Sequence, residues 1–295
     1  MKVRSILKLV GVAAAASLLL GAVAQAPASA TPTKNVYKLL WSEEFNAKKG
    51  TGPNPKIWNY DMGLGPNAEK QYYTQLRKNS ATDGNGNMVL TARVITERDP
   101  LYNYCMPDIV DNCWYSSARL KSSGLVGFKY GSMVARIKMP AGKGAWPAFW
   151  MLGESINAGV SWPLCGELDI VEAKGEPNNQ VFGTAHGPGY SGGQGVGDMF
   201  LNTEPLSEGY HNYRINWKPN RVEWYFDGKL YHTITPNSVW GNEWVYNQEF
   251  FLILNLAMGG LFVGDIDPVN VKKSEMSVDY IRYYSVNGVG KVIKH

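Results

Sequence analysis

Short runs rich in Val, Ile, Tyr, Phe and Trp, bounded by Gly, Asn, Asp or Pro, fill most of the chain after its first thirty residues. Such runs indicate strands, and helical periodicity is scarce. Residues 212–218 and 221–226 flank Pro219-Asn220 and predict a hairpin, and Asp227-Gly228 supplies a second turn into residues 229–234. Many short strands with regular turns predict an all-β fold, a β-sandwich.

Residues 1–30 have the pattern of a secretory signal peptide. A positively charged start precedes an apolar run over residues 9–23, and Ala28-Ser29-Ala30 offers a small-residue cleavage site. The apolar run is too short and too rich in Ala and Gly to favour the alternative, a retained membrane anchor. We therefore expect the leader to be removed and the mature protein to be secreted to the extracellular space.

Charge and composition limit the partners and the number of domains. The chain has 29 basic and 25 acidic residues, and three of the basic ones lie in the leader. The mature net charge is then about +1, which argues against nucleic acid or an anionic membrane as a partner. Residues 31–295 contain no repeat, linker or break in composition. We expect them to form a single domain that acts as a monomer.

Two of the three cysteines, Cys105 and Cys113, lie close together in a loop that contains Pro and Asn. In an exported protein, a disulfide that closes this loop is the leading interpretation. The third, Cys165, is better interpreted as a small packed residue than as a reactive thiol, because no Cys/His catalytic spacing surrounds it. A different pairing among the three stays open.

Three carboxylates, Glu167, Asp169 and Glu172, are interleaved with apolar side chains. On a strand Glu167 and Asp169 share one face, and Glu172 falls on the other because its number has the opposite parity. One extra residue around Ile170 or Val171, a β-bulge, would return Glu172 to the acidic face. Three acids on one face repel each other, which is a cost unless they have a function.

The spacing of the outer pair suggests a chemistry. With a bulge, Glu167 and Glu172 are four strand steps apart, roughly 13 Å between Cα atoms, and side chains that lean together would close the gap to roughly 5 Å. Carboxyl groups about 5–5.5 Å apart are typical of retaining glycoside hydrolases, whose nucleophile and acid/base flank the bond that is cut. The alternative is an exposed acidic strand edge without function.

The aromatic content is high, with ten Trp and seventeen Tyr. Sugar rings stack on aromatic planes, so a polysaccharide cleft would use some of these residues, although most are expected to pack in the core or on the surface. The candidates for the cleft are those near the acidic strand, Trp146, Trp150 and Trp162. His186, on a later predicted strand, is either a partner of the carboxylates or a structural residue.

Taken together, these segments resemble glycoside hydrolase family 16 over most of the mature chain, in its laminarinase branch of endo-β-1,3-glucanases. The motif Glu167-Leu-Asp169-Ile-Val-Glu172 resembles the family signature in its bulged form, and this motif with the others in order is a strong signal. The other matching motifs are Trp41-Ser-Glu-Glu-Phe45, Asn67-Ala-Glu-Lys-Gln-Tyr-Tyr-Thr74, Ser117-Ala-Arg119-Leu, Trp146-Pro-Ala-Phe-Trp150-Met, His186-Gly-Pro-Gly-Tyr-Ser-Gly-Gly193 and Asn255-Leu-Ala-Met-Gly-Gly260.

The resemblance implies a β-jelly-roll sandwich of two antiparallel sheets, similar to concanavalin A, with a substrate cleft on the concave face. It implies that Glu167 is the nucleophile, that Glu172 is the acid/base and that Asp169 tunes the pair. His186 and Trp162 match positions near the cleavage point. Substrate-binding positions further along the cleft match Trp146, Arg119 and Asn67.

Two stretches depart from the laminarinase pattern. Lys70 stands where the branch usually has an apolar residue, and Leu261-Phe-Val-Gly264 replaces a polar, Trp-containing continuation. Both stretches are expected near the cleft, so they bear on the fine specificity and not on the chemistry.

Members of the family often carry a structural calcium far from the cleft. By resemblance its ligands would be Glu44, a backbone carbonyl near Gly86, and Asp279, since hard oxygen ligands suit this ion. The alternative is an ordinary surface pair of acids. The sequence has no HExxH or CxxC spacing, and no catalytic cofactor is expected.

The expected function is that of a secreted, retaining endo-β-1,3-glucanase that cleaves laminarin-type glucan by double displacement. The alternatives are a hydrolase of the same family acting on mixed-linkage glucan or a galactan, a transglycosylase, and a non-catalytic glucan-binding protein. The binding protein is disfavoured because such proteins typically lack the catalytic acids, and this chain keeps all three.

Overall fold

The computed structural model describes residues 35–105 and 113–295. The predicted signal peptide lies outside the described residues. Within them the chain is almost entirely β, and its strands form one eleven-stranded and one nine-stranded sheet. The short helical segments are α1 (Tyr102–Cys105), η1 (Glu154–Ala158), η2 (Gly192–Gln194) and η3 (Pro236–Val239).

The eleven-stranded sheet consists of β1 (Tyr37–Glu43), β3 (Gly63–Leu64), β4 (Gln71–Tyr73), β5 (Ser80–Thr82), β6 (Met88–Val94), β7 (Tyr115–Ser117), β10 (Gly131–Lys138), β15 (His211–Lys218), β16 (Arg221–Phe226), β17 (Lys229–Ile234) and β19 (Lys273–Val286). Its order is β17-β16-β15-β10-β19-β6-β7-β4-β3, with β1 paired to β19 and β5 to β6. The long strand β19 thus joins β10, β6 and β1.

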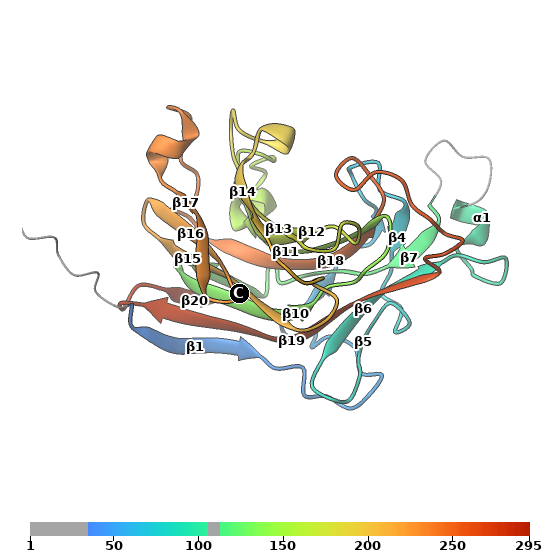
Figure 1. The fold of residues 1–295 in the computed structure, drawn as a ribbon. Helices are drawn as coiled ribbons and strands as arrows, with labels where there is room; N and C mark the ends of the chain where they lie inside the picture. The colour runs from blue at the N-terminus through green and yellow to red at the C-terminus, as the bar shows by residue number, and fades with distance from the viewer. Residues whose placement is uncertain (1–34, 106–112) are drawn as a thin grey trace, which may run out of the picture. The chain divides into compact units, whose positions relative to one another are not determined.

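The nine-stranded sheet consists of β2 (Asn59–Tyr60), β8 (Arg119–Lys121), β9 (Val126–Lys129), β11 (Ala145–Gly153), β12 (Glu167–Ala173), β13 (Gln180–His186), β14 (Val196–Leu201), β18 (Phe250–Met258) and β20 (Lys291–Lys294). Its order is β14-β13-β12-β11-β18-β8-β2, and β9 joins β18 to β20. Figure 1 shows β11, β12 and β18 in one layer, above the layer that holds β10 and β19. The predicted all-β sandwich is confirmed.

The predicted hairpins are also confirmed. Strand β15 pairs antiparallel with β16 across Pro219-Asn220, and β16 pairs with β17 across Asp227-Gly228. The φ angles of Asp227 and Gly228 are 45° and 80°. A two-residue turn with positive φ at both positions matches the right-handed twist of its strands, which is why Asp-Gly favours it.

The core lies between the sheets. On β11, Phe149 and Met151 point into it, whereas Trp150 and Leu152 point to the outer face, as strand alternation predicts. The opposite sheet contributes Trp217, which is buried in the same core. Each large apolar side chain buried in this way contributes about 1.5–3 kcal/mol, so the shared core fixes which residues of the nine-stranded sheet face outward.

The cysteines have different environments. Cys105 and Cys113 are joined by a disulfide, and both pack with Ile95 in a small cluster apart from the main core. Cys165 is a buried free thiol, packed against Leu152 and its neighbours. Burial, helped by the nearby charge of Glu167, raises the pKa of the Cys165 thiol to about 11. The thiolate is the reactive form of cysteine, so this residue is suited to packing and not to catalysis.

The part of the chain over Asn35–His295 forms one compact unit. None of the helices in the described ranges has the length and hydropathy needed to cross a membrane.

Candidate active site

A β-bulge brings the three acidic residues of β12 to one face. The pairing of β12 with β11 shifts by one residue after Asp169, which leaves Ile170 without a partner. The pairing with β13 shifts between Asp169 and Glu172. As a result, Glu167, Asp169 and Glu172 all line the same cleft. The predicted bulge and its consequence are confirmed.

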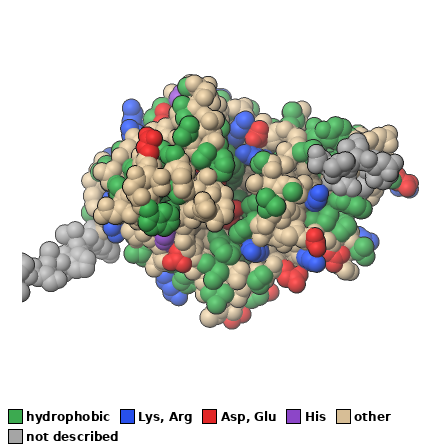
Figure 2. Space-filling model, turned by 90° about the horizontal axis from the view of Figure 1, so that it is seen from above, with side chains coloured by type: hydrophobic (Ala, Val, Ile, Leu, Met, Phe, Trp, Pro, Cys, Tyr) green, Lys and Arg blue, Asp and Glu red, His purple; other side chains and the backbone are tan. Residues whose placement is uncertain are grey.

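The cleft has a volume of about 350 Å³ and lies on the outer face of the nine-stranded sheet. Figure 2 looks onto the molecule from above and shows a face that is hollowed near its middle. The residues that line the cleft are Pro66, Asn67, Glu69, Tyr73, Arg119, Trp146, Ala148, Trp150, Leu152, Ile156, Trp162, Glu167, Asp169, Glu172, Asn255 and Ala257. Every predicted substrate-binding residue is therefore in the cleft.

Each of the two outer glutamates accepts a hydrogen bond from a tryptophan. The indole Nε1 of Trp162 donates to Oε2 of Glu167 over 2.9 Å, and Nε1 of Trp146 donates to Oε1 of Glu172 over 2.9 Å. These bonds orient both carboxyl groups and stabilise their charged forms. Trp162 is 45% exposed and Trp146 only 9%, so the first indole also offers an open face to a ligand.

His186 lies behind Asp169. Its Nε2 is 3.1 Å from Oδ2 of Asp169 and 3.8 Å from Oε1 of Glu167, and the imidazole is almost fully buried. Gly195 covers the other side of the ring, since a Cβ built on it would lie 2.4 Å from Cε1 of His186. The structure thus places His186 against the carboxylates but not in the cleft lining.

The carboxyl groups are difficult to ionise together. Burial raises the pKa of Glu167 and of Asp169 well above their usual ranges, and the charge of Asp169 raises that of Glu167 further. Burial also raises the pKa of Glu172, although the hydrogen bond from Trp146 acts against it. Like charges in a site of low dielectric repel strongly. Ionisation of one of the three therefore makes ionisation of the others harder.

Two of the predicted substrate-binding residues, Trp150 and Arg119, contact each other. The Trp150 indole donates a 2.7 Å hydrogen bond to Oδ1 of Asn255, and the Arg119 guanidinium lies 5.0 Å above the Trp150 ring. Arg119 also forms an ion pair with Asp61, at 3.1 Å. Asn67 is a separate part of the cleft lining. The contacts of Trp150 with Asn255 and Arg119 fix the position of its ring at the cleft wall.

Sequence reasoning missed a polar network beside Glu172. Glu69 accepts hydrogen bonds from Gln71 and, over 3.1 Å, from the hydroxyl of Tyr73. Tyr73 in turn accepts one from Asn255 Nδ2 over 3.2 Å. The negative charge of Glu69 contributes to the raised pKa of Glu172. Residues 67–74 and 255–260, which contain this network, are both motifs that resemble the family. The resemblance assigned no role to Glu69 or Tyr73.

One departure from the laminarinase pattern packs against the site. The ring of Phe262 lies 5.2 Å from that of Trp146 and 5.1 Å from that of Phe182. Nζ of Lys174 lies 4.5 Å from the Phe262 ring centre. Phe262 therefore buttresses the tryptophan that hydrogen-bonds Glu172.

The residues predicted to hold calcium have arginine partners. Both carboxylate oxygens of Glu44 accept hydrogen bonds from Arg282, at 2.9 and 2.8 Å, and Asp279 is paired with Arg136. Both oxygens of Glu44 and one oxygen of Asp279 are thus paired with guanidinium groups, which would compete with a dication for them. A calcium held by Glu44, Gly86 and Asp279 stays a prediction, which melting temperatures measured with added calcium and with a chelator would test.

Comparison with known proteins places this site in a family. The family model for glycosyl hydrolases family 16 matches residues 68–282. A beta-glucanase of Rhodothermus marinus is 34% identical over an alignment of 262 positions, which covers 84% of this chain and 85% of the relative. A glucan endo-1,3-beta-glucosidase A1 of Niallia circulans is 31% identical, and the chain spans only 37% of its length.

A solved structure agrees with these relatives. The laminarinase catalytic domain from Thermotoga maritima MSB8 superimposes with a TM-score of 0.75 and is 40% identical, and the match covers 84% of this chain and 98% of that domain. The family match spans more than half of the chain and includes the whole acidic strand. This chain is therefore a glycosidase that belongs to glycosyl hydrolase family 16.

Proposed function

We propose that the protein is a secreted, retaining endo-β-1,3-glucanase in which Glu167 is the nucleophile and Glu172 is the acid/base. The observation that carries the proposal is the pair of outer glutamates on one bulged strand, each held by its own tryptophan at a cleft wall. Similarity to beta-glucanases and to a laminarinase supports β-1,3-glucan as the substrate. An open cleft lined by Trp146, Trp150 and Trp162 suits the interior of a polysaccharide.

In the first step the Glu167 carboxylate attacks the anomeric carbon while Glu172 transfers its proton to the glycosidic oxygen. The bond to the leaving sugar breaks, and a glycosyl ester of Glu167 forms. Burial raises the pKa of Glu172, which keeps the proton available for transfer. Burial and the charge of Asp169 raise the pKa of Glu167 as well, and the hydrogen bond from Trp162 acts against this rise, toward the ionised form that the step requires.

In the second step Glu172, now a carboxylate, takes a proton from water, and the resulting hydroxide attacks the anomeric carbon. The ester bond breaks and the Glu167 carboxylate returns. Asp169 lies beside Glu167, and its negative charge raises the pKa of Glu167. The two carboxyl groups therefore resist being ionised at the same time. Asp169 and His186 thus have positioning and electrostatic roles behind the reacting pair.

The test is product analysis on laminarin and on mixed-linkage β-glucan, with the anomeric configuration followed in time by NMR. We expect β-configured products that appear before mutarotation, with laminarin cleaved at internal bonds. Inversion would contradict the double displacement, and activity on agar or galactan without activity on laminarin would contradict the substrate.

A comparison of Glu167→Gln with the wild type separates an enzyme from a binding protein. The variant should lose hydrolysis and keep its affinity for laminarin, because the amide preserves the shape of the cleft. Unchanged behaviour in every assay would support a non-catalytic glucan-binding role instead. Secretion rests on the sequence of residues 1–30, and the N-terminus of the protein recovered from the medium of a producing cell would test it.

A further inference from the structure

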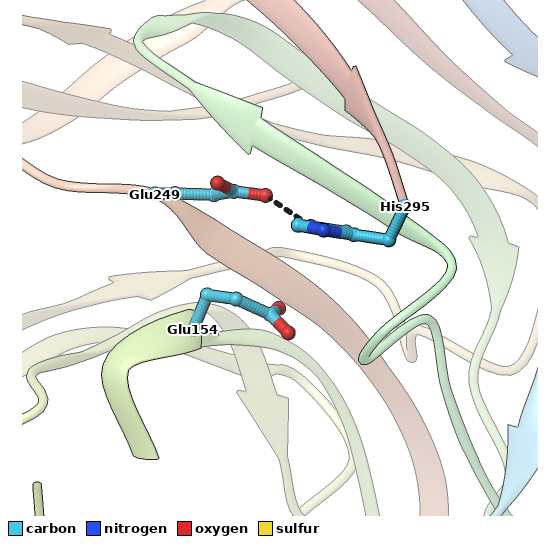
Figure 3. A group of neighbouring side chains, drawn as sticks. All are labelled: Glu154, Glu249 and His295. Carbon is cyan, nitrogen blue, oxygen red and sulfur yellow. Dashed lines mark hydrogen bonds and ion pairs between the residues drawn. The ribbon is translucent and has the colours of Figure 1, made fainter. Parts of the chain in front are cut away.

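A second group of potential ligands lies away from the proposed reaction centre. Glu154 begins η1, Glu249 immediately precedes β18 and His295 follows β20. One ligand atom from each lies within 4.8 Å of the other two. Figure 3 shows the three side chains converging from separate parts of the chain. Ligand atoms around a tetrahedral zinc are roughly 3.4 Å apart, so small side-chain shifts suffice to enclose one.

The geometry points to a binding site for one divalent transition-metal ion, of which zinc is the best match, held by Glu154, Glu249 and His295. An imidazole with two carboxylates is a donor set that zinc accepts, with the fourth position left for water. Calcium and magnesium prefer oxygen ligands throughout, so the histidine argues against them. The site is independent of the proposed glucanase activity.

Glu154 supplies the observation that points most directly to a cation. Its Oε1 accepts hydrogen bonds from the Gly124 backbone N–H at 3.1 Å and from Asn157 Nδ2 at 2.6 Å. Its Oε2 is buried and has no hydrogen-bond partner within the described residues. A buried carboxylate oxygen without a donor is costly. The second oxygen is thus left available to a metal ion while the first is fixed.

The other two ligands are also held in place. His295 Nε2 lies 2.7 Å from Oε1 of Glu249, so a hydrogen bond already joins two of the proposed ligands. Glu249 packs directly on Gly127, where an added Cβ would lie only 1.9 Å from Oε1. The backbone N–H of His295 donates to the carbonyl of Leu125 at 3.1 Å. Partners of this kind orient metal ligands in proteins.

The local charge favours a cation. In the described ranges, the one ion pair made by Glu249 is with His295, and Glu154 forms none with a lysine or an arginine. The backbone N–H of Glu154 donates to the carbonyl of Glu249 at 2.9 Å, which keeps the two acids together. A divalent ion would neutralise both. It would also tie the C-terminal strand to η1, whose residue Ile156 lines the cleft.

The test is titration of the untagged, chelator-treated protein with zinc chloride by calorimetry. We expect one zinc per chain and a higher melting temperature with zinc than without it. Glu154→Gln and His295→Gln, which keep the side-chain shapes, should each lose both effects. Asn157→Ala, which frees Glu154 from its donor, should weaken binding about 10- to 100-fold. Glu97→Gln, an exposed glutamate elsewhere, is the matched control and should bind as the wild type does.

A second control addresses the reaction centre, where Glu167, Asp169 and His186 also bring ligand atoms within 4.8 Å of one another. Glu167→Gln should bind zinc as the wild type does. Binding that disappears in Glu167→Gln but survives in Glu154→Gln and His295→Gln would overturn the assignment, and so would the absence of binding to the wild type. His295 is partly exposed, so its variant keeps the test decisive if Glu154→Gln does not fold.

Discussion

The indole Nε1 of Trp224 donates a 2.7 Å hydrogen bond to the backbone carbonyl of Asp169. Trp224 belongs to β16 in the opposite sheet and is fully buried. A bulge disrupts the local ladder, and a buried backbone carbonyl needs a donor. The eleven-stranded sheet therefore helps to hold the acidic strand of the other sheet in its bulged form.

Replacement of this tryptophan should affect both stability and catalysis. Trp224→Phe keeps an aromatic ring but leaves the Asp169 carbonyl without its donor, so we expect the free energy of unfolding to fall by about 1–3 kcal/mol. We also expect a lower kcat on laminarin, because the acids lose their alignment. Chemical denaturation and steady-state kinetics measure the two effects.

The matched control is Trp217→Phe. Trp217 is equally buried and donates a 2.9 Å hydrogen bond to the carbonyl of Tyr246, a residue that is not part of β12. The Trp217→Phe variant should be less stable than the wild type and should keep the kcat of the wild type. Equal losses of kcat in both variants would show that the bond to Asp169 has no special role.

The effect on kcat of removing the proposed acid, Glu172, should depend on the leaving group of the substrate. Glu172→Gln cannot protonate the glycosidic oxygen, so kcat on laminarin should fall by about 10²–10⁴-fold. With a dinitrophenyl glucoside, whose leaving group needs no proton, the first step should be largely restored. Burst kinetics would reveal the accumulated glycosyl-enzyme. Equal losses on both substrates would count against Glu172 as the acid.

Neutralisation of Asp169 should stabilise the protein at neutral pH. Burial raises the pKa of Asp169 well above its usual value of 3.8, so on raising the pH the unfolded state loses this proton before the folded state does. Below about pH 3.8, Asp169 is protonated in both the folded and the unfolded state, and no stability is lost. Above this pH the free energy of unfolding falls.

Asp169→Asn cannot ionise, so its melting temperature should exceed that of the wild type at neutral pH. The difference should shrink as the pH falls toward 3.8. The control is Asp198→Asn, at an exposed position on β14. Melting curves across pH measure both variants, and a gain that persists unchanged in acid would refute the argument from ionisation.

Phe262 should matter to catalysis through Trp146. Phe262→Ala removes the ring packed 5.2 Å from the indole that donates to Glu172. An aromatic pair contributes about 0.5–1.5 kcal/mol, so we expect kcat/KM to fall by up to about tenfold. Leu261→Ala changes the adjacent side chain, which is 82% exposed, and should leave the kinetics unaltered. The kinetics of both variants on laminarin provide the measurement.

Local periodicity explains how much of the acidic strand could be predicted. Alternation along a strand involves only neighbouring residues, so parity alone required a bulge to bring Glu172 beside Glu167 and Asp169. The same rule separated Trp150 from Met151 on β11. Turn chemistry was equally local, since Asp227-Gly228 carries its conformational preference in its own backbone.

Contacts between distant segments could not be predicted in this way. The hydrogen bond between Asn255 and Tyr73 joins residues 182 positions apart, and the bond from Trp224 to Asp169 crosses from one sheet to the other. The group of Glu154, Glu249 and His295 likewise comes from three separate parts of the chain. No local pattern in the sequence marks these pairs.

The sequence by itself determined the strand content, the bulged acidic motif and the family, because each depends on residues a few positions apart or on whole motifs in order. Only the tertiary structure decided which donor each outer glutamate receives, that burial raises the pKa values of the three acids, and that arginines pair with Glu44 and Asp279. Those properties depend on distance and solvent exclusion, which arise only when the two sheets pack together.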